Sequence, residues 1–185
     1  MTRRTTAIAL RKARDSHELL RVGRLWSDGT FEGYVGAVAE TWAALHVLDD
    51  NIYLDGFAAV RLDDVTSLER RGGPEAFAAR SLALDDSWPP PPPPADVDLT
   101  SVRRILITAA QRYRVVSIYI ERDDPDVVFV GRVAGFNDKT LMLLELTAKA
   151  EWLKEPSAWR LDEITRIDFG GEYERKLLRV ADAAR

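Results

Sequence analysis

The stretch "RLDDVTSLE", residues 61–69, recurs almost unchanged as "RLDEITRID", residues 160–168. Arginine, leucine, the first aspartate and threonine are identical in the two stretches, and most other positions are close exchanges. Only Ser67 and Arg166 differ in kind. A motif that one chain carries twice is typical of two copies of one folding unit, because each copy keeps the residues that form the same turn and strand. The repeat therefore predicts two similar domains in tandem.

The similarity extends towards the N-terminal side of both motifs. "EGYVGAVAETWAALHVLD" (32–49) aligns with "VVFVGRVAGFNDKTLMLLEL" (127–146). The alignment pairs Gly36 with Gly131 and Leu45 with Leu141. Its offset grows along the chain, which predicts small insertions in the second copy, the last of them around "AKAEWLKEPS". Connecting loops accept such insertions, whereas strands do not.

Each copy predicts one helix followed by five strands. The helices are expected at 4–14 and 99–111, the second with Thr100 as its N-cap. Alternating apolar residues predict the strands, and Asp-Gly and Asp-Pro pairs mark turns between the first two strands of each copy. The strands are expected at 18–26, 31–40, 43–49, 56–62 and 65–70, and at 113–121, 127–136, 140–146, 157–163 and 164–169. With a further helix over 170–184, the fold class is mainly β with N-terminal helices (α+β).

Six consecutive prolines separate the two copies within "SWPPPPPPADVD" (87–98). Such a run stiffens into a polyproline helix and predicts a spacer. The expected domains are therefore 1–84, a proline-rich linker at 85–96, and 97–185 including the C-terminal helix. The alternative, a ligand for SH3 or WW domains around Trp88, is weaker because the run lacks flanking basic residues.

Composition places the chain among globular proteins, with 46% hydrophobic and 30% charged residues. No apolar stretch has the length of a membrane helix, and the start "MTRRTTAIALRKARD" lacks a signal-peptide core, so we expect a cytoplasmic protein away from membranes. The chain has no cysteine and two histidines. Since it also lacks a phosphate-binding loop and a nucleophile motif, we expect no enzyme, no catalytic residue, no metal, no cofactor and no small-molecule substrate.

Basic side chains gather in the two predicted helices, although a net charge of −4 gives no general attraction to nucleic acid. Such clusters bind phosphates without reading sequence, and their affinity falls with salt. The alternative is a solvated helix face. The candidate nucleic-acid-binding residues are Arg3, Arg4, Arg11, Lys12, Arg14, Arg103, Arg104, Arg112 and Arg114. They are joined by His46, which strand alternation places on the face away from the core.

Acidic pairs and tryptophans are the remaining candidates. Four acidic pairs, at 49–50, 63–64, 85–86 and 123–124, lie where turns are predicted, so turn formation explains them better than cation binding. An aromatic cage for a methylated ligand is one interpretation of the five tryptophans, and interface packing is the more common one. The candidate interface residues are Trp42, Trp152, Arg61 and Arg160.

A basic helix followed by five short antiparallel strands resembles the Sm and Sm-like fold. "FVGRVAGFNDKTLMLLEL" (129–146) is similar to the first Sm motif, and "AVRLDDVTSLE" and "AWRLDEITRID" occupy the place of the second. The last two also resemble the ends of small bacterial Sm-like proteins of uncharacterised function. The resemblance covers nearly all of both copies and implies two Sm-like, or SH3-like, five-stranded small β-barrels in tandem.

The uridine pocket that the resemblance implies is not expected in this chain. In RNA-binding Sm proteins an asparagine of the first motif contacts a base, and here that position holds His46 or Met142. The second motif of that family carries a basic residue followed by glycine, and here Leu62 and Leu161 follow the arginines. The expected function is therefore a non-catalytic interaction or assembly module that binds a protein, or a second copy, through strand edges. The alternative is an RNA-binding Sm-like protein that uses its basic helices.

Overall fold

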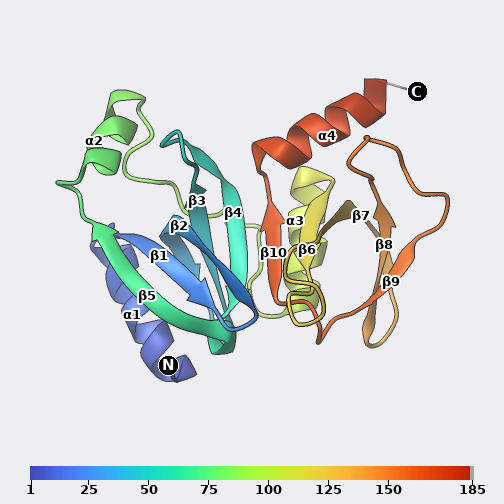
Figure 1. Cartoon of the computed structure of the whole chain (residues 1–185), viewed down its shortest axis with the longest axis horizontal. Helices are drawn as coiled ribbons and strands as arrows, with labels where there is room; N and C mark the ends of the chain where they lie inside the picture. The colour runs from blue at the N-terminus through green and yellow to red at the C-terminus, as the bar shows by residue number, and fades with distance from the viewer. Residues whose placement is uncertain (184–185) are drawn as a thin grey trace. The chain divides into compact units, whose positions relative to one another are not determined.

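The computed structural model describes residues 1–183, so the final residues of the expected second domain and of the expected 170–184 helix, 184 and 185, lie outside the described residues. The chain divides into two compact units, Met1–Ala95 and Asp96–Arg185. The described residues form four α-helices and antiparallel strands, and the fold is mostly β (Figure 1). Neither unit's sheet closes on itself, because the strands at its two ends do not pair with each other.

Unit 1 begins with a helix, continues with five strands and ends with a second helix. Its sheet has the order β5-β1-β2-β3-β4, so the fifth strand returns to pair with the first. The elements are α1 (Arg3–Asp15), β1 (Leu19–Arg24), β2 (Ser27–Val38), β3 (Trp42–Leu48), β4 (Leu54–Arg61), the short 3₁₀ turn η1 (Leu62–Asp64), β5 (Val65–Gly72) and α2 (Phe77–Leu84).

Unit 2 has the same order of elements and the same strand neighbours. Its sheet runs β10-β6-β7-β8-β9, with the fifth strand again beside the first. The elements are α3 (Val102–Tyr113), β6 (Val116–Tyr119), β7 (Val128–Phe136), β8 (Thr140–Glu145), β9 (Ser157–Arg160), β10 (Arg166–Phe169) and α4 (Glu172–Ala183). The expected helices and strands therefore all occur, and α2 is an additional helix that the sequence did not predict.

Side-chain caps start the first helix of each unit. The Thr2 hydroxyl accepts the backbone N–H of Thr5, and the Thr5 hydroxyl accepts the N–H of Thr2, which together make a capping box. The α3 helix is capped by Ser101, whose hydroxyl accepts the N–H three residues further on. The expected cap, Thr100, instead donates its hydroxyl to Asp98. The N-cap therefore lies one residue later than predicted, and the helix begins at Val102 rather than at residue 99.

The core of unit 1 lies between α1 and one face of its sheet. Leu10 of α1 is fully buried in a cluster with Val22 of β1, Val35 of β2 and Leu45 of β3. On the other face, Leu82 of α2 packs with residues of β1 and β2. Both faces of the sheet are covered because strand alternation places apolar residues on each of them.

The register of the strands corrects the alignment of the two copies. Val35 lies opposite Leu45, and Val133 lies opposite Leu143. The equivalent glycines are therefore Gly33 and Gly131 rather than Gly36 and Gly131, and Leu45 corresponds to Leu143 rather than Leu141. The reason for glycine is close strand contact. A Cβ atom would lie 2.7 Å from a β3 carbonyl oxygen at Gly33 and 2.5 Å from a β8 carbonyl oxygen at Gly131.

The proline-rich stretch lies against unit 1. The Trp88 ring makes edge contacts with the rings of Tyr34 and His17, at centroid distances of 5.3 and 5.8 Å. Pro93 packs directly over Gly36 in β2. Glycine is needed there because a Cβ atom would meet the proline ring at 2.5 Å. The run expected to be a plain spacer is thus packed along a sheet, and the boundary between the units falls after residue 95.

None of the helices in residues 1–183 is both long enough and apolar enough to cross a membrane.

Candidate functional site

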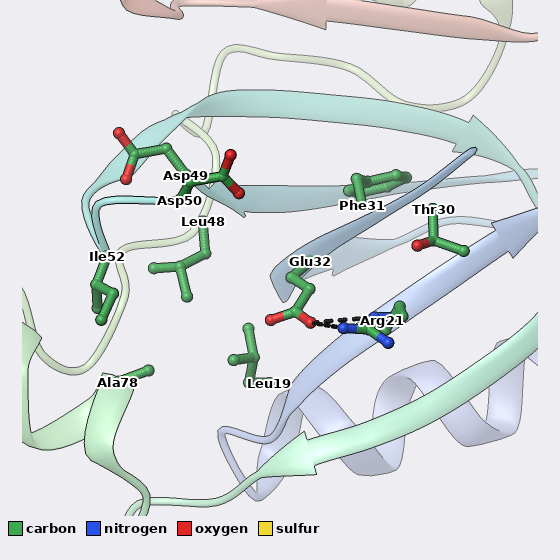
Figure 2. A pocket seen from close by; sticks show the side chains of 10 residues that line it. All are labelled: Leu19, Arg21, Thr30, Phe31, Glu32, Leu48, Asp49, Asp50, Ile52 and Ala78. Carbon is green, nitrogen blue, oxygen red and sulfur yellow. Dashed lines mark hydrogen bonds and ion pairs between the residues drawn. The ribbon is translucent and has the colours of Figure 1, made fainter.

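A pocket of about 550 Å³ opens on the face of the unit 1 sheet that carries α2 (Figure 2). Leu19 of β1 and Leu48 of β3 form its apolar floor, and Ala78 of α2 and Ile52 of the β3–β4 loop form one side. Sheet alternation brings residues of three strands to this face, and α2 adds the wall. The pocket therefore depends on a helix that the sequence did not predict.

The polar part of the pocket is an ion pair at its centre. Figure 2 shows Arg21 facing Glu32, and the two side chains form two hydrogen bonds of 3.1 and 2.9 Å. Arg71 of β5 donates to the same Glu32 oxygen at 3.1 Å. Two guanidinium groups thus neutralise the Glu32 carboxylate. Glu32 therefore carries no uncompensated negative charge that would attract a cationic ligand.

The rim of the pocket is a tight turn. The Asp49 carboxylate accepts the backbone N–H groups of Asn51 and Tyr53 at 2.9 and 2.8 Å, so the first residue of this acidic pair stabilises the turn that the sequence predicted. Ile52 in the same turn has a φ angle of 66°, in the left-handed region that a β-branched residue rarely adopts. Such strain often occurs at functional sites.

The pocket combines apolar and charged side chains. The ten residues that line it include no histidine, serine or cysteine; its polar side chains are those of Arg21, Thr30, Glu32, Asp49 and Asp50. Within residues 1–183, no group of three His, Cys, Asp or Glu side chains is placed to hold a metal ion.

The basic residues of α1 divide into paired and unpaired side chains. Arg3 forms an ion pair with Asp63, and Arg14 forms one with Asp15 at 2.8 Å. These four residues are largely exposed to solvent, so each pair contributes little to stability. In the part of the chain that the structure describes, the exposed residues Arg4, Arg11 and Lys12 form no ion pair.

The four arginines predicted in the second basic cluster all have acceptors. Arg103 lies 4.9 Å over the ring of Phe136 and donates to the backbone carbonyls of Asn137 and Asp138. The others contact carboxylates: Arg104 with Asp98 at 2.8 Å, Arg112 with Asp96 at 3.5 Å, and Arg114 with Asp182 at 2.9 Å. Hydrogen bonds from Thr100 and then from Arg104 lower the pKa of Asp98 to about 2, so this partner stays charged at neutral pH. A phosphate would have to displace these acceptors.

His46 is buried rather than exposed. Its ring stacks on Phe57 at a centroid distance of 4.3 Å, and its hydrogen bond is made with the backbone of Pro91. Burial lowers the pKa of His46 below the ordinary histidine value. The alternation that directed this ring away from the core was predicted correctly, but the proline-rich stretch covers it. The expected base-stacking position is therefore corrected.

The candidate interface residues also differ in exposure. Trp42 is 2% exposed and is a core residue of β3, with Arg61 lying 4.9 Å over its ring, so it is corrected from surface to core. Trp152 is half-buried and packs against a cluster formed with α4. Arg160 is exposed at the end of β9, where it pairs with Asp162 at 2.6 Å. Of this set, Arg160 is the one that lies openly at a sheet edge.

The pocket itself was not found from the sequence. Only the turn at 49–51 could be predicted from the sequence. The other lining residues come from strands and a helix that are distant from one another along the chain. Comparisons with known proteins add no relative: no family model matches the chain, and neither a curated protein nor a solved structure shows significant similarity to it.

Proposed function

We propose that the chain is a non-catalytic, cytoplasmic assembly module of two Sm-like units with open sheets, and that copies of it associate through their strand edges. The support is the arrangement shared by the two units, in which one helix precedes five strands and the fifth strand pairs with the first. This order is similar to that of the Sm-like fold, and the duplicated motif spans the turn from the fourth strand to the fifth in both units.

The observation that carries the proposal is a pair of free edges. The β5 strand pairs with β1 alone and β9 pairs with β8 alone among the described residues. An edge strand exposes unpaired N–H and C=O groups, and these can pair with a strand of another chain. Because the two edges differ, contact between β9 of one copy and β5 of the next is head-to-tail and can close into a ring.

The hydrogen-bond register shows which residues of β9 direct their backbone N–H and C=O groups to the unpaired side of the strand. Leu161 donates its N–H to the carbonyl of Lys139 at 2.9 Å. In an antiparallel strand, every second residue directs its backbone N–H and C=O groups to the same neighbouring strand. Trp159, two residues before Leu161, therefore also bonds to β8. Ala158 and Arg160 therefore turn their backbone N–H and C=O groups to the free edge. A proline at 158 would remove an outward N–H without breaking a bond inside the sheet.

We expect Ala158→Pro to abolish self-association while the unit stays folded. Sedimentation velocity should show the wild type and the control Ala158→Ser as the same oligomer, because serine keeps the N–H. The proline variant should sediment as a single 20.8 kDa chain with an unchanged circular dichroism spectrum. A wild type that sediments as a single chain at every concentration, or a proline variant that still associates, would overturn the proposal.

RNA binding is the second candidate, and one observation favours it. Arg4, Arg11 and Lys12 lie on the exposed side of α1 without ion partners among the described residues. Uncompensated cations on a helix can contact phosphates directly, whereas the α3 arginines must first leave their acceptors. This candidate therefore assigns the interaction to α1 rather than equally to both helices.

Fluorescence anisotropy with short U-rich and A-rich RNAs tests this candidate. Replacing Arg4, Arg11 and Lys12 with serine should weaken binding of both RNAs and reduce the slope of log affinity against log salt by about 2. The matched variant, with Arg103, Arg104, Arg112 and Arg114 replaced by serine, should have the smaller effect. Absence of RNA binding by the wild type at low salt would remove the candidate, and an equal effect of both variants would contradict its assignment to α1.

A further inference from the structure

Two arginines of unit 2 share one carboxylate. Arg114 follows α3 and donates to one oxygen of Asp182 at 2.9 Å, and Arg132 of β7 approaches the other oxygen at 3.5 Å. Arg132 also lies 4.4 Å over the ring of Trp152, which holds its guanidinium in place. The Asp182 carboxylate thus lies between two cations, as the head of an anionic ligand would.

The same two arginines line a second pocket. It has a volume of about 390 Å³, and its other lining residues are Ile107, Ala110, Gln111 and Val133. Its size is in the range of small-molecule sites, which combine apolar walls with a few polar groups that fix orientation. Here the apolar wall comes from α3 and β7, and the polar groups are the Gln111 amide and the guanidinium groups of Arg114 and Arg132.

Local conformation disfavours both Arg114 and Asp182 at their positions. Arg114 has a φ angle of 71° just after the end of α3, where glycine is the preferred residue. Asp182 lies in the last turn of α4, where the helix dipole disfavours negative charge. The fold nevertheless brings them together beside the pocket. Strained residues at a cavity support a functional role for it.

We propose that this pocket binds a small carboxylate with an aliphatic body, and that Asp182 occupies the head-group position when the ligand is absent. The ligand carboxylate takes the place of Asp182 between Arg114 and Arg132, and its aliphatic part lies against Ile107 and Val133. Binding therefore replaces the ion pairs of Asp182 with Arg114 and Arg132, while the apolar residues of α4 stay packed against β7. The proposal concerns unit 2 alone and is independent of strand-edge association.

Isothermal titration of the full chain with octanoate tests the proposal. Octanoate supplies the carboxylate and an aliphatic chain, acetate supplies the head without the chain, and octylamine supplies the chain with the opposite charge. We expect measurable binding of octanoate and much weaker binding of the other two. Asp182→Asn removes the internal competitor and should tighten octanoate binding roughly 1.5- to fivefold, the range expected for an exposed ion pair.

Variants of the two arginines complete the test. Arg114→Gly should abolish octanoate binding while the melting temperature stays equal or rises, because glycine suits the left-handed backbone at this position. Arg132→Gln should also abolish binding and should shift the NMR signal of the Trp152 indole N–H. The proposal is overturned if octanoate fails to bind Asp182→Asn, if octylamine binds as tightly as octanoate, or if Arg114→Gly binds octanoate like the wild type.

Discussion

Replacing Leu45 with alanine is expected to lower the free energy of unfolding by about 2–5 kcal/mol. Leu45 is fully buried in β3, in the cluster that includes Leu10 of α1. Truncation removes buried apolar surface and leaves a cavity that close-packed neighbours fill poorly. Denaturant unfolding followed by circular dichroism measures the loss.

Leu143 provides the matched test in unit 2. It is also fully buried and occupies the equivalent place opposite Val133. Leu143→Ala should cost a similar amount. The control is Ile8→Ala, because Ile8 is 56% exposed on α1 and its truncation should change stability by less than about 0.5 kcal/mol. A small effect at either leucine would contradict the equivalence of the two positions in the two cores.

Gly131→Ala is expected to destabilise the protein by about 1–3 kcal/mol, although it adds one methyl group. The added Cβ would lie 2.5 Å from the carbonyl oxygen of Leu144 and 2.8 Å from the Leu143 side chain. Neither neighbour can move without shifting β8 away from β7. Thermal and denaturant unfolding of the purified variant measure the effect.

A glycine in the same strand provides the control for this substitution. No heavy atom lies within 4 Å of the position that a Cβ would take at Gly135. Gly135→Ala should therefore leave stability unchanged or raise it by about 0.4–1 kcal/mol, because alanine restricts the unfolded chain. Gly33→Ala in unit 1 should behave like Gly131→Ala, since its Cβ would meet the His46 carbonyl at 2.7 Å. Equal effects at Gly131 and Gly135 would contradict close strand contact as the cause.

The positions of the strands were predicted well from the sequence. The residue-by-residue correspondence between the strands of the two copies was not. Alternating apolar residues located all ten strands, because a sheet needs one face against a core. The pairing of Gly36 with Gly131 was wrong. Gly33 and Gly36 are each followed two residues later by a valine, as Gly131 is, so matching residue types could not show which of the two glycines corresponds to Gly131. The structure shows a bulge after Val35 in β2 and after Val133 in β7, and only the hydrogen-bond ladder reveals such a bulge.

The candidate sites were predicted less well, for a related reason. Charge clusters were visible in the sequence, but their partners were not. Arg104 meets a nearby aspartate, whereas the partner of Arg114, Asp182, lies far along the chain. His46 was placed on the correct face of its strand, yet the proline-rich stretch that covers it gave no sign of packing there. Whether a side chain is exposed depends on which segments of the chain pack over it in the folded protein.

The sequence by itself determined the duplicated motif, the order of one helix and five strands in each unit, and the absence of thiol chemistry. These follow from local periodicity, turn residues and composition, which act over a few residues. The tertiary structure alone decided which glycines allow strands to touch, which arginines stay without partners and where the two pockets lie. Those features arise from contacts between segments far apart in the chain, and side-chain identity alone does not specify such contacts.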